Sequence, residues 1–303
     1  MSDKTNLAHL IPKNGRLCNV LFRSVATTII SEKCNLKVQY EDKYYDKIVN
    51  RLGIPLFSGT IGTPYKNTMR FNTKTFEAVY LKSIESSDDV RIGMVKDFFQ
   101  NDVASDKIFK YLNRQDVNRS VINHNPHKMR YGNNNDTFVH IRWGDARGHC
   151  PEPSYFIKAI GDPNHFDTLY IGSCSRSNII IDNLKRHYKN IIILTYDEVE
   201  TIQFGSTCKN IVLSHGSYSA IIGYLSYKSK KISFCNIPRN HWCPMDMFFK
   251  KGFNPIDDQK SSAKFNKMTK QKNKINEEKR IKKEQHKKAK RDEKERIKKE
   301  QTN

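Results

Sequence analysis

The sequence predicts an α/β protein whose second half forms a parallel sheet of the Rossmann type. From residue 137 to residue 235, short apolar runs alternate with segments of helical periodicity, which is the pattern of strands joined by helices. Polar residues follow several of these runs, and from Gln259 onward the chain becomes densely charged. We therefore expect a first domain over residues 1–130, a second domain over residues 131–258, and a charged, helical or disordered tail over residues 259–303.

The first half is expected to begin with a strand, a glycine turn and a helix. Residues 8–12 form a short apolar run, Asn14-Gly15 interrupts it, and residues 17–30 carry apolar side chains at helical spacing. A junction of this kind can bind an anion at the helix N-terminus, although most such junctions only connect two elements. Further strands are expected at residues 37–40 and 76–81, and further helices at residues 43–52, 93–113 and 116–122, with a break near residues 98–101.

The second half alternates more regularly. Residues 124–135 include Asn-Pro, Gly and three consecutive Asn residues, which is typical of a linker. Helices are expected at residues 153–160, 175–188 and 217–227, with a short one near Asp197. Strands are expected at residues 137–142, 168–172, 191–195, 211–213 and 231–235, the last of which closes the expected sheet.

The most informative stretch is Phe138-Val139-His140-Ile141-Arg142-Trp143-Gly144-Asp145. Its apolar start predicts a buried strand, and ligands of open α/β sheets bind just beyond the carboxyl ends of strands. Arg142 carries a planar fork of donors that suits a phosphate or a carboxylate. The alternative is a surface arginine paired with Asp145 across a tight turn, and the stretch by itself leaves both interpretations open.

A second stretch, Ser214-His215-Gly216-Ser217-Tyr218-Ser219, lies between another expected strand and its helix. Ser217 is a favourable N-cap residue, and capping alone would explain it. Its place at a second strand end in the same half as Arg142 favours a shared site, with the hydroxyls of Ser217 and Ser219 facing it.

The charge of the chain favours an anionic partner. Of the net +21, the 18 Lys and Arg against 7 Asp and Glu in residues 259–303 supply +11, which leaves about +10 for residues 1–258. A basic folded part indicates an anionic ligand, substrate or surface. The tail has almost no apolar residues for docking, so we expect it to be dispensable for folding. It suits contact with an anionic surface or a nucleic acid, and a solvated helix and disorder both stay open.

No apolar run reaches the roughly 18–20 residues of a membrane span, and the first residues lack the apolar core of a secretory signal. We therefore expect a cytoplasmic protein with reduced thiols. No cysteine forms a CxxC pair, so no zinc site is expected; the seven are Cys18, Cys34, Cys150, Cys174, Cys208, Cys235 and Cys243.

Four separated stretches resemble one family, the GDP-fucose-dependent fucosyltransferases, and most closely its α-1,2-fucosyltransferase branch. Gly15-Arg16-Leu17-Cys18-Asn19 resembles the GGLGNQ or GRFGNQ loop, and Phe98-Phe99-Gln100-Asn101 resembles GYFQS. His140-Ile141-Arg142-Trp143-Gly144-Asp145 resembles HVRRGD. Residues 213–225 resemble SNSSFSWWAAYL. The order and spacing agree over roughly residues 8–235, which makes the set fairly specific although each motif is weak alone.

The resemblance implies a GT-B fold, in which two Rossmann-like domains face a cleft, and inverting transfer of fucose from GDP-fucose to a sugar hydroxyl without a metal. It implies that Arg142 contacts the β-phosphate and that His140 lies near the nucleotide. It implies further donor contacts from Arg16 and Asn19 of the first domain and, in the second domain, from the turn Ser217, Tyr218 and Ser219 and from Asp197, whose carboxylate would accept from guanine N1 and N2.

Several positions depart from the family pattern. The second arginine of HVRRGD is Trp143, and the Gly-Asn-Gln of the first loop is Cys18-Asn19-Val20. The aromatic pair after the serine turn is Ala220-Ile221. These departures leave the sugar and the acceptor open more than the fold, and they leave open a relative without catalytic activity.

The chemistry of sugar transfer sets its own requirement. The leaving diphosphate must be stabilised by a metal or by fixed donors, and the chain contains no Asp-x-Asp pair. Arg142, the serine turn and a helix N-terminus are the expected substitutes, with no cofactor. The general base is not identified; Asp145 is one candidate, and orienting Arg142 is at least as good an account of it.

Two alternative functions remain. One is a glycosyltransferase of the same fold that uses another sugar nucleotide. The other is a nucleic-acid-binding protein that acts through its basic charge, although no known nucleic-acid motif occurs in the folded part.

Overall fold

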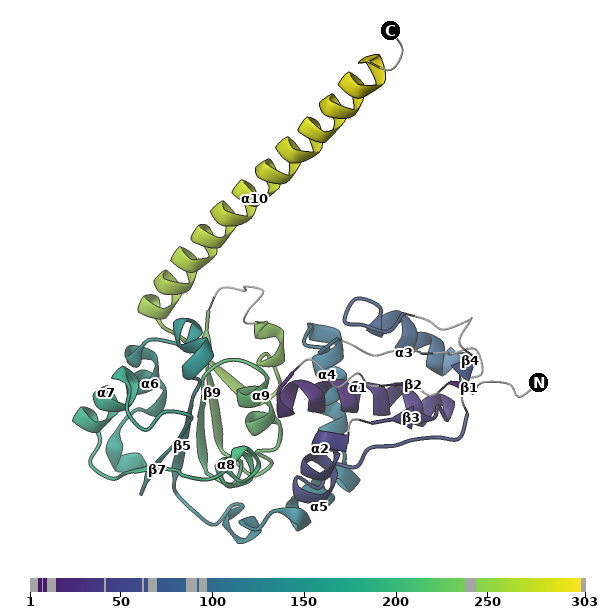
Figure 1. Ribbon diagram of the computed structural model, residues 1–303. Helices are drawn as coiled ribbons and strands as arrows, with labels where there is room; N and C mark the ends of the chain where they lie inside the picture. The colour runs from purple at the N-terminus through teal and green to yellow at the C-terminus, as the bar shows by residue number, and fades with distance from the viewer. Residues whose placement is uncertain are drawn as a thin grey trace.

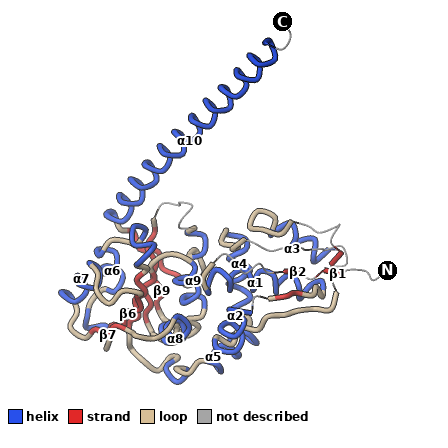
Figure 2. The backbone as a smooth tube through the Cα atoms, viewed as in Figure 1, coloured by secondary structure: helices blue, strands red, loops and turns tan. Residues whose placement is uncertain are grey.

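The computed structural model describes residues 5–6, 8–9, 15–40, 42–61, 63–64, 70–85, 92, 97–237 and 244–300. Figure 1 shows two parts side by side, with a single long helix that projects from the second part. Figure 2 shows the strands of the second part gathered into one sheet among helices. The expected α/β class is confirmed.

The sheet of the second half has six parallel strands in the order β10-β9-β8-β5-β6-β7. Numbered by their place in the chain from β5, they stand in the Rossmann order 3-2-1-4-5-6. The order reverses between β5 and β8, so the connections leaving these two neighbours diverge. The strands are β5 (Thr137–Ile141), β6 (Leu169–Ser173), β7 (Ile191–Ile193), β8 (Asn210–Leu213), β9 (Lys231–Asn236) and β10 (Phe253–Asp257).

The central strand β5 is buried along its whole length. Val139 lies opposite Ile171 of β6 and Val212 of β8, and helices cover both faces of the sheet. A parallel strand covered on both faces reads as a continuous apolar run, which explains why residues 137–141 signal a strand so clearly. The same burial fixes the position of everything that follows Ile141.

Four helices cover the sheet. α6 (Pro153–Ile160) packs on β8, β9 and β10 and against α7 (Ile179–His187). α8 (Glu198–Gly205) packs on β6, and α9 (Ser217–Tyr224) packs on β8. Short 3-10 helices follow β5 at Gly144–His149, α6 at Pro163–His165 and β9 at Met245–Met247.

The first half is mainly helical where it is described. β1 (Thr5–Asn6) pairs with β4 (Thr63–Pro64) antiparallel, and β2 (Ala8–His9) pairs with β3 (Val38–Gln39) in parallel. A second Rossmann-like domain stays a prediction. The helices are α1 (Leu17–Cys34), α2 (Asp42–Asp46) with a π-helical turn at Lys47–Arg51, α3 (Phe76–Glu85), α4 (Asp102–Leu112), α5 (Gln115–His124) and a 3-10 turn at Lys128–Arg130.

Helix α1 connects the two halves. It packs against α3 and α4 of the first half and against α9 of the second, and 15 of its 18 residues are buried. Its buried set includes Arg23, whose Nε donates to the Asp97 carbonyl at 3.2 Å and whose guanidinium lies over the Phe98 ring. α1 is therefore a core helix, and its first turn lies beside the start of α9.

Residues 76–81, predicted as a strand, form the first part of helix α3, so that prediction is wrong. Phe76, Val79 and Ser83 are buried on one side of this helix, which is a spacing of three and four residues. A short apolar run does not distinguish a strand from a helix by periodicity alone.

Residues 231–235 were predicted as the last strand of the sheet, and that prediction is wrong because β10 adds a sixth strand beside β9. Its sequence, Phe253-Asn254-Pro255-Ile256-Asp257, contains a proline and polar residues, and so resembles a loop. Proline is tolerated in a strand at the edge of a sheet, where its missing N–H needs no partner.

The charged tail begins as part of the folded body. Helix α10 (Gln259–Glu300) follows β10, and Phe265 is fully buried in the apolar core. The Ser261 hydroxyl accepts from the Glu152 amide at 2.9 Å, and Lys264 Nζ donates to the Cys150 carbonyl at 2.9 Å. The expectation that the tail lacks docking residues is wrong for its first three turns, because one phenylalanine is enough to anchor a helix start.

None of the helices in the described ranges is both long and apolar enough to cross a membrane. The six cysteines that the structure describes are free thiols.

Candidate active site at the strand ends

Polar residues from the two strands at the reversal point meet beyond the carboxyl edge of the sheet. β5 ends in His140 and Ile141 and is followed by Arg142, while β8 is followed by Ser214 and His215. Ligands of open α/β sheets bind where the strand order reverses. The sequence prediction that Arg142 and the serine turn share one edge of the sheet therefore agrees with the topology.

His140 is fixed by the serine turn. It is buried, and its Nδ1 lies 2.6 Å from the Ser219 hydroxyl, within hydrogen-bond distance. Its ring packs against that of Tyr218, with 4.9 Å between centroids. Burial, and then the charge of Arg142, lower the pKa of His140 to about 3. The imidazole is therefore neutral at physiological pH.

Arg142 influences three elements at once. Its positive charge lowers the pKa of His140 on β5 and, after the larger effect of burial, that of His215 beyond β8. It also opposes the rise in the pKa of Cys18 that burial and Glu198 cause. A half-buried guanidinium that acts on β5, β8 and α1 together is a favourable place for an anion.

Asn19 and Ser217 connect the two halves directly. The Ser217 hydroxyl donates to Asn19 Oδ1 at 2.6 Å, and Gln100 Nε2 donates to the same oxygen at 2.9 Å. The three residues come from α9, α1 and the segment before α4. The donors of Ser217 and Gln100 therefore converge on the Asn19 oxygen. An oxygen of a bound phosphate also accepts hydrogen bonds from several converging donors.

The N-cap of helix α9 lies one residue earlier than the predicted cap, Ser217. This N-cap is Gly216 with φ 85°, and no side chain caps the helix. Glycine adopts this left-handed conformation without steric cost. Ser217 is consequently the first helical residue, and its hydroxyl is directed to Asn19 instead of to its own helix. The first amides of a helix have no partner within it, so the start of α9 can also accept an anion.

Tyr218 and Ser219 position other groups. The Tyr218 hydroxyl donates to the Glu198 carbonyl at 2.6 Å, and Ser219 is fully buried against His140. Direct phosphate contact by their side chains stays a prediction. In this structure they orient α8 and His140.

Asp197 is the N-cap of α8. Its Oδ1 accepts from the amides of Val199 and Glu200 at 2.9 and 2.8 Å, and its Oδ2 pairs with Arg51 at 2.7 Å. Burial opposes its charge, but these hydrogen bonds and the arginine outweigh burial and lower its pKa. The proposed contact with guanine stays a prediction, and it would have to share the carboxylate with Arg51.

Arg16 and Asp145 complete the predicted set. Arg16 is exposed at the N-cap of α1, and its carbonyl accepts from the amides of Asn19 and Val20 at 2.9 and 3.1 Å. Asp145 belongs to the 3-10 helix after β5, and its side chain lies outside the described residues. Its roles as base or as partner of Arg142 both stay predictions.

Sequence reasoning missed the contacts among Cys150, Ser214 and His215, which are all buried. Ser214 Oγ lies 3.3 Å from His215 Nδ1 and 3.5 Å from Cys150 Sγ. The ring centroids of His149 and His215 are 6.3 Å apart. Burial, then Arg142 and the neighbouring His149, hold the pKa of His215 well below its usual value. The histidines carry no local pattern, and only their positions after β5 and β8 could have indicated them.

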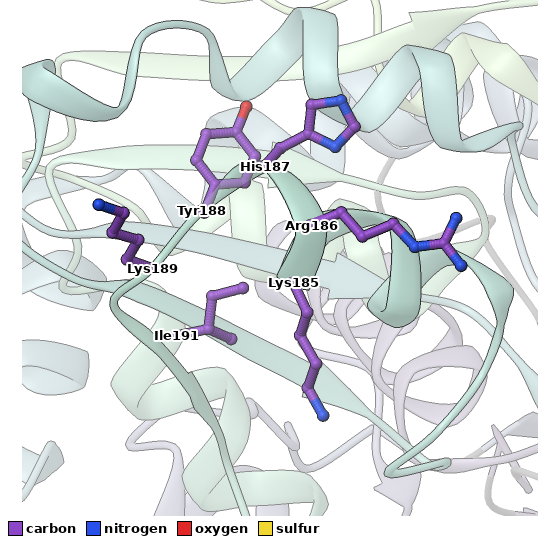
Figure 3. Close-up of a pocket in the computed structure, with 6 residues that line it drawn as sticks. All are labelled: Lys185, Arg186, His187, Tyr188, Lys189 and Ile191. Atoms are coloured by element: carbon purple, nitrogen blue, oxygen red, sulfur yellow. The ribbon is translucent and has the colours of Figure 1, made fainter.

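A separate hollow lies at the other edge of the sheet. A cavity of about 420 Å³ lies at the end of α7 and the start of β7, and Figure 3 shows the side chains that line it. Ile191 is the first residue of β7, so this cavity lies toward the amino ends of the strands, away from Arg142. Its lining residues are Lys185, Arg186, His187, Tyr188, Lys189 and Ile191.

Among the residues that the structure describes, no three His, Cys, Asp or Glu side chains are grouped so that they could hold a metal ion.

Comparison with known proteins gives matches to structures only. No family model matches the chain, and no curated protein matches it. E. coli heptosyltransferase WaaC with ADP superposes with a TM-score of 0.47 at 9% identity, over 84% of this chain and 95% of the other. The same enzyme with ADP-2-deoxy-2-fluoro heptose gives 0.46 at 9% identity, over 88% of this chain and 100% of the other. Fucosyltransferase NodZ from Bradyrhizobium gives 0.45 at 10% identity, over 76% and 94%.

Proposed function

We propose that this protein is an inverting, metal-independent glycosyltransferase that transfers fucose from GDP-fucose to a hydroxyl of a glycan acceptor. The observation that carries the proposal is the meeting of four stretches that are distant in sequence. Gln100 and Ser217 both donate to Asn19, and Ser219 contacts His140 two residues before Arg142. These are the four stretches whose residues resemble the fucosyltransferase motifs.

The donor diphosphate would bind between Arg142 and the start of α9. Arg142 supplies a bidentate cation for the β-phosphate, and the first amides of α9 with the Ser217 hydroxyl supply neutral donors. Asn19 and Arg16 would add contacts from the first half, and Asp197 would accept from guanine. His140 remains neutral and adds no charge of its own, so the net positive charge at the phosphates comes from arginine.

The reaction breaks the bond between the anomeric carbon and the β-phosphate oxygen, and forms a bond from that carbon to the acceptor oxygen. Negative charge develops on the leaving GDP, and Arg142 with the α9 donors would stabilise it there. The acceptor proton passes to a base. Asp145 is the candidate for that base, and its alternative role is to orient Arg142.

A nucleotide panel tests the proposal. Calorimetric titration with GDP, UDP, CDP and ADP should show the tightest binding for GDP, and GDP-fucose should be hydrolysed slowly without acceptor. Tighter binding of another nucleotide would contradict GDP-fucose as the donor and would favour a donor sugar attached to that nucleotide. No binding of any of the four would overturn the assignment of a nucleotide-sugar site.

A further inference from the structure

Helix α10 separates its charges by face. It runs from Gln259 to Glu300, and an α-helix turns by about 100° per residue. On that count, half of the 18 basic residues of the tail fall within one sector of about 120°, and none of its 7 acidic residues does. The nine basic residues of this sector are Lys272, Lys279, Arg280, Lys283, Lys287, Lys290, Arg291, Lys294 and Lys298. We call this sector the basic face.

The basic face continues the side of the helix that docks on the body. Ser261 and Phe265, which are both fully buried, fall in the same sector of the helix on the same count. Beyond them the helix leaves the body (Figure 1), and every residue from Gln271 to Lys290 whose exposure the structure describes is exposed. The first three turns therefore anchor the helix and fix its rotation. Counted along the sequence, the basic residues of this face span roughly 40 Å of the helix axis, at 1.5 Å per residue.

The composition of α10 distinguishes between anionic partners. A helix that lies in a membrane interface carries apolar or aromatic residues on the face opposite its cations. Here the rest of the helix holds all seven acidic residues, and Ile275 and Ile281 are isolated and exposed. This distribution of charge fits an anionic partner that contacts only the basic face of α10 and is recognised by its charge.

We infer that the basic face of α10 binds the phosphate backbone of a nucleic-acid duplex. A duplex presents one phosphate charge per roughly 1.7 Å of its axis, so a row of cations that lies along the duplex meets phosphates wherever a strand passes beneath it. The acidic residues on the remaining faces would be repelled from phosphates, which keeps the helix on the outer ridge of the duplex instead of deep in a groove. Binding of this kind positions the protein and does not read sequence.

The test compares two triple variants of the full chain that have the same net charge. Lys283→Gln, Lys287→Gln and Lys294→Gln neutralise three of the nine cations of the basic face, and Lys282→Gln, Lys288→Gln and Lys299→Gln neutralise three lysines outside it. The probes are a mixed-sequence DNA duplex of about one to two helical turns and vesicles that contain phosphatidylserine.

Binding is measured by fluorescence anisotropy over a series of salt concentrations. Each lost phosphate contact should lower the slope of log K against log salt by roughly 0.9. The basic-face variant should therefore lose roughly 2.7 from the slope, while the control variant keeps the wild-type slope. Equal losses in both variants would overturn the inference, because net charge alone would then explain binding. Binding to the vesicles without binding to the duplex would overturn it as well.

Discussion

His140 and His215 are buried imidazoles beside a guanidinium. Burial, and then the charge of Arg142, lower the pKa of both. An extra proton on either ring would place a second positive charge next to Arg142 without water to screen it. The fold therefore keeps these histidines neutral beside the charged Arg142.

Stability should depend on pH through His140. Above the unfolded pKa of about 6.5, both the folded and the unfolded chain hold this ring neutral, and it contributes no pH dependence. As the pH falls from 6.5 toward the folded pKa of about 3, only the unfolded chain takes up the proton, so the free energy of unfolding decreases. Between pH 7 and pH 5 the decrease from this one group should be about 2 kcal/mol.

The measurement is urea unfolding at both pH values for the wild-type protein and His140→Gln. Glutamine does not titrate, so the variant should lose about 2 kcal/mol less between pH 7 and pH 5, whatever its absolute stability. An identical pH dependence in the two proteins would show that His140 titrates normally in the fold.

At the scale of elements, the first turns of α10 and its projecting part have different roles. The Asp258 carboxylate accepts from the Ser261 amide at 2.8 Å at the start of the helix, and Lys264 pairs with Glu152 at 2.9 Å. Phe265 is buried among the core residues. Folding should therefore depend on residues up to about 270 and not on those beyond.

Two truncations test this division. A chain that ends after Lys270 should unfold at nearly the same temperature as the full chain. A chain that ends after Asp258 should be much less stable, because removal of a buried phenylalanine alone costs roughly 3–5 kcal/mol. Differential scanning calorimetry of both proteins decides the matter, and Phe265→Ala in the full chain is the matched point variant. Equal melting temperatures for the two truncations would contradict the docked start of α10.

The strands of the sheet could be predicted where burial made the sequence uniform. Residues 137–141 predict a strand clearly because both faces of β5 are covered. β10 lies at the edge of the sheet, and its proline and polar residues do not predict a strand. Residues 76–81 show the opposite difficulty, since Phe76 and Val79 suit either periodicity. The anchor of α10 was missed because one phenylalanine in a charged segment has no periodic partner.

The part of the candidate site that could be predicted consists of the residues that follow the carboxyl ends of strands. Arg142 and Ser217 follow from the rule that parallel strands end at one edge. Asn19 lies at the expected junction of a glycine turn and a helix, and the family resemblance assigned it a donor contact. The contacts that build the site join residues 79 and 198 positions apart. The first depends on β8 and its helix α9 lying beside β5, and the second on the packing of α1 against α9. No local pattern in the sequence expresses either arrangement.

At the scale of the molecule, the site takes residues from both halves. Ion pairs join Lys47 to Glu198 and Arg51 to Asp197, each at 2.7 Å, and Gln203 Nε2 donates to the Arg51 carbonyl at 2.6 Å. The pairs are about a third to a half exposed, so each contributes little to stability. Their effect is to hold α8, which Asp197 caps, against the first half beside Asn19 and Ser217.

Catalysis should not need a divalent metal if the protein alone stabilises the leaving diphosphate. The hydrolysis of GDP-fucose should continue at an unchanged rate after exhaustive dialysis against a chelator, because in the proposed mechanism Arg142 and the start of α9 supply the positive charge and the donors. Recovery of a chelator-inactivated enzyme on addition of magnesium or manganese would show that phosphate binding has been assigned to the wrong groups.

The most direct test of the account is the replacement of Arg142, with GDP binding measured by calorimetry and GDP-fucose turnover measured in parallel. Arg142→Ala should weaken GDP binding and lower the rate roughly a hundredfold, which corresponds to about 3 kcal/mol for one charged donor. Arg142→Lys should also fail, because a point charge does not reproduce a two-pronged contact. Asp145→Asn is the companion variant: milder loss of both rate and affinity indicates that Asp145 orients Arg142, and lost turnover with normal GDP binding indicates the base. An Arg142→Ala protein that binds GDP and turns over at the wild-type rate would contradict the central claim.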